Sequence, residues 1–153
     1  MRVGDPAPDF ALRDQDGVER RLTDFLASGP VVLFFYPAAS SAGCTRETCH
    51  FRDLASEFAA LGARRVGISM DSVDKQAAFA QSNHLDYPLL ADTGGAVARL
   101  YGVKRAFDVL RVRRTTFVID AHGIVREIIA SELSTNAHAD RALAALSALI
   151  NPR

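Results

Sequence analysis

Apolar positions along this chain follow two patterns, one typical of strands and one typical of helices. The run from Val31 to Tyr36 is continuously apolar, β-branched and aromatic, and it predicts a strand covered on both faces near the centre of a sheet. Before it, Phe10 to Leu12 and Val18 to Leu22 flank an Asp-Gly turn and predict an N-terminal hairpin. Further strands are expected over Arg65 to Met70 and Tyr87 to Ala91.

Helical spacing of Phe51, Leu54, Phe58 and Leu61 predicts an amphipathic helix from about Gly43 to Leu61. The other expected elements carry turn or capping signals: a helix from Asp71 or Ser72 to about Asn83, a short helix from Gly95 to Tyr101, a hairpin of Thr115 to Asp120 with Ile124 to Ile129, and a last helix that begins near Thr135 or Asn136. We therefore expect an α/β fold in one domain over residues 1–153, with a central mixed β-sheet flanked by helices and an N-terminal β-hairpin.

Charge and composition exclude several classes of partner. Eighteen basic residues balance eighteen acidic ones, and no run of Lys and Arg offers a site for phosphates, so nucleic acid is not an expected partner. No segment approaches the roughly 18 apolar residues of a membrane span, and the first residues lack the apolar stretch of a signal peptide. We expect a soluble, cytoplasmic protein that does not bind membranes.

Cys44 and Cys49, the only two cysteines, are the strongest chemical signal. A Pro, Ser and Gly loop follows the central strand and places Cys44 in the first turn of the next helix, where unpaired N–H groups and the helix dipole stabilise a thiolate. In a reducing cytosol, two such cysteines indicate catalysis, redox sensing or metal binding rather than a permanent structural bridge.

The separation of the two cysteines along the helix bears on the choice between catalysis, redox sensing and metal binding. Residues five apart in a regular helix have Cα atoms about 8.6 Å apart, whereas a disulfide needs less than about 7 Å. Cys44 and Cys49 can therefore pair only after the opening turns of the helix unwind. We expect Cys44 to attack an oxidant and become a sulfenic acid, and Cys49, on the polar side near Arg52 and Ser56, to capture it. His50 raises a zinc alternative, but the chain lacks the paired ligand spacing of such sites.

The segment Tyr36-Pro37, Ser41, Gly43-Cys44-Thr45 and Cys49 resembles the active site of peroxiredoxins of the peroxiredoxin Q group, also called bacterioferritin comigratory proteins. Four further blocks extend the resemblance over nearly the whole chain: Val3 to Phe10, Ser69 to Ser72, Tyr87 to Asp92 and Arg114 to Asp120. The resemblance implies a thioredoxin-like fold, reduction of hydrogen peroxide and organic hydroperoxides, thioredoxin or a similar dithiol as reductant, and no metal or organic cofactor. The family group also suggests a monomer.

The resemblance assigns roles around the peroxide to Pro37, Ser41, Cys44 and Arg114. Arg114 would favour the thiolate and polarise the O–O bond, Ser41 would hydrogen-bond the peroxide, and Pro37 would shape the pocket. The family usually has threonine where Ser41 stands, and serine lacks the methyl group that restricts its rotamer.

Several alternatives stay open at this stage. The adjacent Arg113 competes with Arg114 for the pocket, and Glu47 either anchors Arg114 or stabilises its own helix. His138 and the other histidines near predicted turns and caps are expected on the surface. A disulfide oxidoreductase would favour cysteines separated by two residues, but a non-enzymatic redox sensor that unfolds on oxidation would use the same two cysteines.

Overall fold

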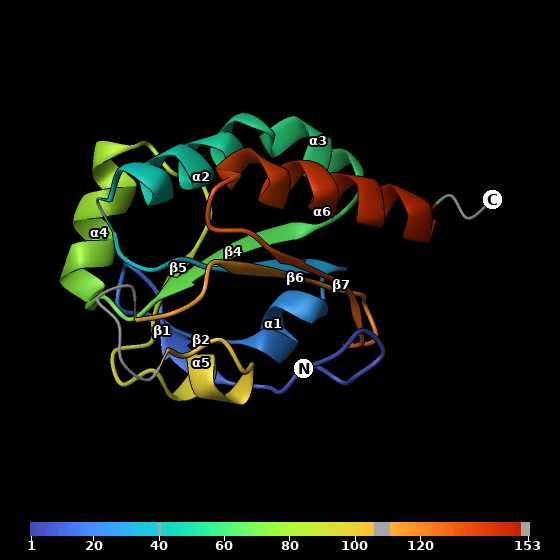
Figure 1. The fold of residues 1–153 in the computed structure, drawn as a ribbon, viewed down its shortest axis with the longest axis horizontal. Helices are drawn as coiled ribbons and strands as arrows, with labels where there is room; N and C mark the ends of the chain where they lie inside the picture. Colours follow the sequence, from blue (N-terminus) through green and yellow to red (C-terminus); the bar gives the residue numbers. More distant parts are fainter. Residues whose placement is uncertain (40, 106–110, 151–153) are drawn as a thin grey trace.

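The computed structural model describes residues 1–39, 41–105 and 111–150, which form one seven-stranded sheet with helices on both faces (Figure 1). The strands are β1 (Ala11–Arg13), β2 (Glu19–Arg21), β3 (Val31–Phe35), β4 (Arg64–Ser69), β5 (Leu89–Ala91), β6 (Thr115–Ile119) and β7 (Val125–Ala130). The helices are α1 (Leu22–Leu26), α2 (Ala42–Asp53), α3 (Ala55–Ala60), α4 (Val73–Ser82), α5 (Ala96–Leu100) and α6 (Thr135–Ile150).

The sheet is mixed, as the sequence predicts, and its order is β2-β1-β5-β4-β3-β6-β7. β3, β4 and β5 run parallel, whereas β6 and β7 on one side and β1 and β2 on the other pair antiparallel. All five residues of β3 are buried, because β4 and β6 flank the strand and helices cover both of its faces. The predicted central strand and N-terminal hairpin are therefore confirmed.

Side chains of β3 alternate between two apolar cores. Leu33 and Phe35 point into the core beneath α1 and α5, whereas Val32 and Phe34 point into the core beneath α2, α3 and α6. Cys44 belongs to this second core, in which the Phe34 ring stacks on Phe51 with a centroid distance of 4.1 Å. The sheet thus fixes the position of the helix that carries both cysteines.

The single helix expected from about Gly43 to Leu61 is wrong in one respect: it breaks at Leu54 into α2 and α3. The Phe51 carbonyl lies beside the break and accepts a hydrogen bond of 2.9 Å from Arg65 Nη1 on β4. A side chain that takes a carbonyl of the helical ladder favours a break at that place. The second strand of the first hairpin is also shorter than expected, because Leu22 begins α1, a helix too short to show periodicity.

Strand register brings Arg114 to the start of α2. Phe35, the last residue of β3, pairs with Thr115, the first residue of β6. The residue before Thr115 therefore lies next to the loop that leaves β3 and enters α2. Two segments far apart in sequence, one bearing Cys44 and the other bearing Arg114, therefore meet where β3 ends and β6 begins.

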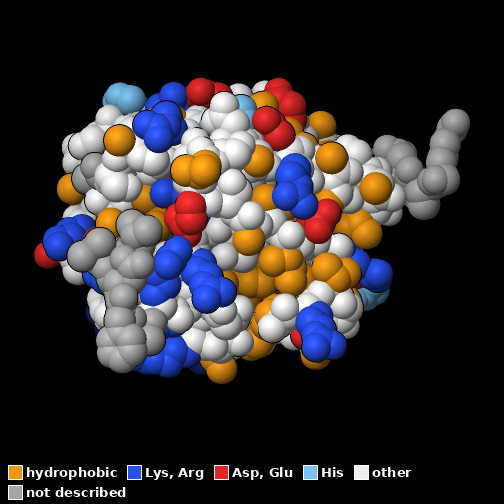
Figure 2. Space-filling view, in the orientation of Figure 1, with side chains coloured by type: hydrophobic (Ala, Val, Ile, Leu, Met, Phe, Trp, Pro, Cys, Tyr) orange, Lys and Arg blue, Asp and Glu red, His pale blue; other side chains and the backbone are white. Residues whose placement is uncertain are grey.

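On the face shown in Figure 2, side chains of both charge signs are interspersed with apolar ones, as the balanced composition indicates. Of the helices in the described parts of the chain, none combines the length and the apolar character needed to cross a membrane.

Candidate active site

Ser41 begins helix α2 and prepares the position of Cys44. Its backbone is extended, and its Oγ accepts a hydrogen bond from the Cys44 N–H at 3.2 Å, which makes Ser41 the N-cap. Ser41 is exposed, whereas Cys44 is 0% exposed. The Ser41 hydroxyl can still donate its own proton, so its role as a cap leaves the expected contact with a peroxide open.

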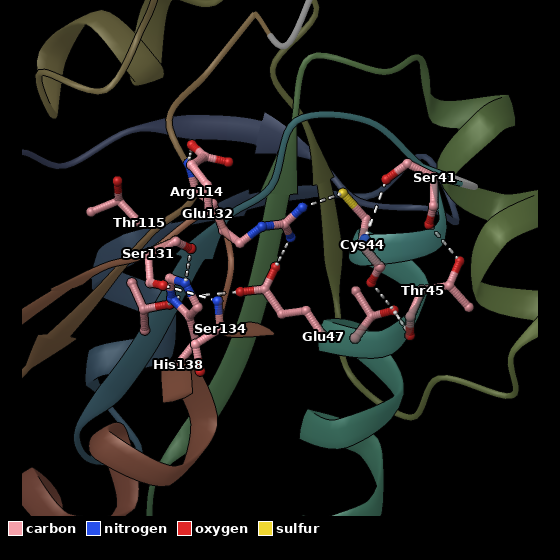
Figure 3. A network of polar contacts seen from close by, with 12 residues as sticks. Ser41, Cys44, Thr45, Glu47, Arg114, Thr115, Ser131, Glu132, Ser134 and His138 are labelled. Atoms are coloured by element: carbon pink, nitrogen blue, oxygen red, sulfur yellow. Dashed lines mark hydrogen bonds and ion pairs between the residues drawn. The ribbon is translucent and has the colours of Figure 1, made fainter. Parts of the chain in front are cut away.

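Arg114 is the cation beside the sulfur (Figure 3). Its Nη2 lies 3.4 Å from Cys44 Sγ and donates to it, and the Arg114 side chain is 6% exposed. Arg113 is exposed, so the structure places Arg114, and not its neighbour, beside the Cys44 sulfur. A Cβ on Gly43 would lie 3.2 Å from Arg114 Nη2, so glycine at this position leaves room for the guanidinium.

Glu47 anchors Arg114 from the next turn of α2. Arg114 Nη1 donates to Glu47 Oε1 at 2.6 Å, and the carboxylate is 0% exposed. Burial raises the pKa of Glu47 to about 8, although the charge and hydrogen bond of Arg114 act in the opposite direction. Burial by itself lowers the pKa of Arg114, but the charges of Glu47 and Cys44 outweigh it and raise that pKa. Of the two roles weighed for Glu47, the structure shows the anchor.

His138 is not on the surface, and that expectation is wrong. The first turns of α6 pack on α2 and the sheet, and they bury His138 completely. One ring nitrogen, Nε2, lies 2.8 Å from the Ser131 carbonyl, and the other, Nδ1, lies 2.7 Å from Thr116 Oγ1. Nδ1 is also 3.6 Å from Glu47 Oε2, so His138 stands behind the Glu47–Arg114 pair (Figure 3). The interior of α6 becomes part of the site.

Pro37 is buried in the loop between β3 and α2, and a carboxylate holds this loop in place. Asp71, which follows β4 and is 5% exposed, accepts hydrogen bonds from Ala39 N at 2.6 Å and Ser69 Oγ at 2.7 Å. Arg111 Nη2 donates to its other oxygen at 3.1 Å. The loop that carries Pro37 is therefore tied to the end of β4.

Cys49 lies in a different environment, as helical projection predicts. It is half-buried, and its Sγ lies 3.7 Å from Asn83 Oδ1, just after α4. Arg52 reaches the same residue, because its Nη1 donates to the Asn83 carbonyl at 2.7 Å. Both cysteines are free thiols in one continuous helix, α2, which keeps them apart.

His50, the residue behind the zinc alternative, makes its contact with α6. Its Nε2 lies 2.7 Å from Asp140 Oδ1. In the described ranges, no three or more His, Cys, Asp or Glu side chains gather closely enough to hold a metal ion.

Replacing Ser41 with alanine is expected to lower the free energy of unfolding by about 1 kcal/mol, because the Cys44 N–H loses its cap. Urea denaturation followed by circular dichroism measures the change. The matched control is Ser41→Thr, which keeps the hydroxyl and should retain most of the wild-type stability. Equal stability of the alanine and threonine variants would contradict the capping role.

Replacing Asp71 with alanine is expected to lower the free energy of unfolding by about 2 to 3 kcal/mol, because it leaves the Ala39 N–H and the Ser69 hydroxyl without their acceptor. The isosteric variant Asp71→Asn keeps one acceptor oxygen and should lose about 1 kcal/mol. Urea titrations of both variants measure the difference. If the asparagine variant is as unstable as the alanine variant, then the charge, and not the acceptor, holds the loop.

Comparison with known proteins gives the same fold and family. The AhpC/TSA family matches residues 3–128. The crystal structure of Peroxidoxin BcpB from Mycobacterium tuberculosis superposes with a TM-score of 0.94 at 57% identity, over 97% of this chain and 98% of that one. A structure of Xanthomonas campestris Peroxiredoxin Q superposes with a TM-score of 0.84 at 32% identity, over 92% of this chain and 91% of that one. Chloroplastic Peroxiredoxin Q of Gentiana triflora is 39% identical over 140 residues, which are 92% of this chain and 64% of that protein.

These neighbours share the thioredoxin-like arrangement of a mixed sheet flanked by helices. The resemblance found in the cysteine segment therefore extends through the whole architecture described above. The chain belongs to the AhpC/TSA family, and within it to the peroxiredoxins of the peroxiredoxin Q or bacterioferritin comigratory protein group.

Proposed function

We propose that this peroxiredoxin reduces hydrogen peroxide and organic hydroperoxides to water or alcohols through a sulfenic acid on Cys44, which Cys49 resolves as an intramolecular disulfide. The observation that carries the proposal is the 3.4 Å contact between Arg114 Nη2 and Cys44 Sγ at the capped start of α2. A permanent cation at this distance favours the thiolate, which is the nucleophilic form of cysteine.

In the first step, the thiolate attacks the terminal oxygen of the hydroperoxide. A new S–O bond forms, the O–O bond breaks, and the negative charge moves to the leaving alkoxide or hydroxide, which takes up a proton. Arg114 is placed to stabilise this charge as it develops. Its buried Nε has no hydrogen-bond partner among the described residues, so the guanidinium has a donor to offer to a peroxide oxygen. Pro37 and Ser41 lie in the loop between β3 and α2.

In the second step, the Cys49 thiol attacks the Cys44 sulfenic acid, so that an S–S bond forms and water leaves. Both sulfurs must approach, and this requires the first turns of α2 to unwind. Thioredoxin or a similar dithiol then reduces the disulfide and restores both thiols. This choice of reductant, the monomeric state and the cytoplasmic location stay predictions.

A second candidate function is a redox sensor that changes shape on oxidation without turning over. The complete burial of Cys44 favours it, because a buried sulfur meets oxidants slowly unless the helix opens. In this case the unwound α2 would recruit a partner protein.

Peroxide consumption in the presence of thioredoxin, thioredoxin reductase and NADPH distinguishes the two functions. The peroxidase is expected to consume many equivalents of hydrogen peroxide per protein, whereas a sensor would consume about one equivalent and stop. The Cys44→Ser variant provides the blank, because it lacks the nucleophile. Consumption that ends after one equivalent in the wild-type protein would support the sensor and contradict the peroxidase.

A further inference from the structure

Behind Arg114, two buried titratable groups face each other from different helices (Figure 3). Glu47 Oε2, on α2, lies 3.6 Å from Nδ1 of His138, on α6, and both side chains are 0% exposed. The other carboxylate oxygen, Oε1, is taken by Arg114, whereas Oε2 has no hydrogen-bond partner among the described residues. A buried carboxylate oxygen without a hydrogen-bond partner raises the free energy of the folded protein. A proton on Glu47 Oε2 or on His138 Nδ1 would lower it again.

His138 can gain or lose a proton without losing a hydrogen bond. Its Nε2 must carry hydrogen, because its partner, the Ser131 carbonyl, can only accept. Its Nδ1 contacts the Thr116 hydroxyl, which can donate to a bare nitrogen or accept from a protonated one. Protonation therefore needs only a reversal of this hydrogen bond, and the new positive charge would face Glu47 Oε2.

Burial shifts the pKa values of Glu47 and His138 in opposite directions, and in both cases it favours the uncharged form. It raises the pKa of Glu47 to about 8, and it lowers the pKa of His138 below its ordinary value. The charged groups that act on the pair are Arg114 before β6, Glu132 before α6 and Arg141 on α6, and Cys44 acts on Arg114. A single proton shared between the carboxylate and the imidazole makes the pair neutral at neutral pH.

We propose that Glu47 and His138 together hold one proton while Cys44 is a thiolate and release it when Cys44 becomes a sulfenic acid. The inference rests on the proposed function, because it assigns a proton to the oxidation step. The thiolate and the peroxide give the sulfenic acid and an alkoxide or hydroxide. The proton that leaves the pair balances the proton that this leaving group takes up, so that water or alcohol forms without net uptake of a proton from solution.

Charge balance around Arg114 is the physical reason. With a thiolate on Cys44, the guanidinium already faces one negative charge, and a neutral Glu47–His138 pair avoids a second one in the same buried site. Oxidation removes the charge from the sulfur. An ionised Glu47 then becomes the counterion of Arg114, so the buried site stays neutral before and after the reaction.

Counting protons tests the proposal. In a Cys49→Ser background, which stops the reaction at the sulfenic acid, hydrogen peroxide is added at neutral pH in weak buffer with an indicator dye, and mass spectrometry counts the sulfenic acid. The ultraviolet absorbance of the thiolate measures, before peroxide is added, whether Cys44 is ionised. We expect almost no proton taken from solution per sulfenic acid formed, and about one when Glu47→Gln is added. Uptake of one proton without that substitution, or an un-ionised Cys44 at neutral pH, would overturn the proposal.

Two histidine variants distinguish the loss of a proton-binding group from the loss of a contact between α2 and α6. His138→Gln removes one of the two places for the proton, so the pH at which uptake rises from zero to one should move to lower values. His50→Gln is the matched control, because His50 also joins α2 to α6, through Asp140, but away from Arg114. An unchanged pH curve in His138→Gln would overturn the shared proton. If peroxide forms no sulfenic acid on Cys44 at all, the proposed function fails instead, and mass spectrometry shows this directly.

Discussion

Replacing Arg114 with methionine is expected to lower the second-order rate constant for oxidation of Cys44 by hydrogen peroxide by about 10² to 10³-fold. The variant keeps an unbranched apolar side chain but removes the cation 3.4 Å from the sulfur and the donors available to the peroxide. The thiolate and the charge on the leaving oxygen both lose their stabilising partner. Stopped-flow oxidation of the reduced protein, followed by trapping of the sulfenic acid, measures the rate constant.

Arg113→Met is the matched control, because the two arginines are adjacent but only Arg114 is buried against α2. This variant should react at the wild-type rate. Arg114→Lys keeps the charge without the planar fork and should fall between the two. Glu47 does not become an unpaired buried charge in the methionine variant, since burial already favours its protonated form. Equal rates for Arg114→Met and Arg113→Met would contradict the role assigned to Arg114.

Local patterns in the sequence predict much of the fold, because they reflect contacts that each segment makes over its whole length. The apolar run from Val31 to Tyr36 can be buried on both faces only at the centre of a sheet, and β3 lies there. The first turn of α2 is also predicted, because a Pro, Ser and Gly loop ends the central strand just before Cys44, and the structure shows that Ser41 caps this turn. The family resemblance added Arg114, which no local pattern identifies.

Long-range contacts set the parts that the pattern does not predict. Helical periodicity continues through Leu54, but the break depends on Arg65, which reaches the Phe51 carbonyl from β4. The partner of Glu47 depends on the register of β3 and β6, which alone brings Arg114 to the same place. Intrinsic propensity cannot contain such information, because it is averaged over all tertiary surroundings.

The burial of His138 is another feature that depends on long-range packing and that the local sequence does not predict. His138 stands near the start of a predicted helix among small and polar residues, and this setting favours an exposed position. Only the packing of α6 on α2 and the sheet turns this position inward, toward Thr116 and Glu47. A sequence signal does exist in retrospect: His138 and Ala142 are four residues apart and lie on the same buried face as Ala139 and Leu146.

Replacing Cys49 with serine is expected to abolish the intramolecular disulfide while leaving one oxidation of Cys44. In the wild-type protein, disulfide formation must unwind the first turns of α2, because the two sulfurs belong to one intact helix. The unwinding also breaks the bonds from Thr48 Oγ1 to the Cys44 carbonyl and from Tyr87 to the Thr48 carbonyl. Hydrogen exchange followed by mass spectrometry should therefore show a large loss of amide protection over 44–49 in the oxidised wild-type protein, and little loss in oxidised Cys49→Ser.

The control for this prediction is Asn83→Ala, which removes the contact of Asn83 with the Cys49 sulfur but keeps the thiol. It should form the disulfide and lose protection as the wild-type protein does, because the resolving step needs the sulfur and not its partner. Turnover with a dithiol reductant should be present in Asn83→Ala and lost in Cys49→Ser. Wild-type turnover in Cys49→Ser, or full protection of α2 in the oxidised wild-type protein, would show that a thiol from outside the chain resolves Cys44 while the helix stays wound.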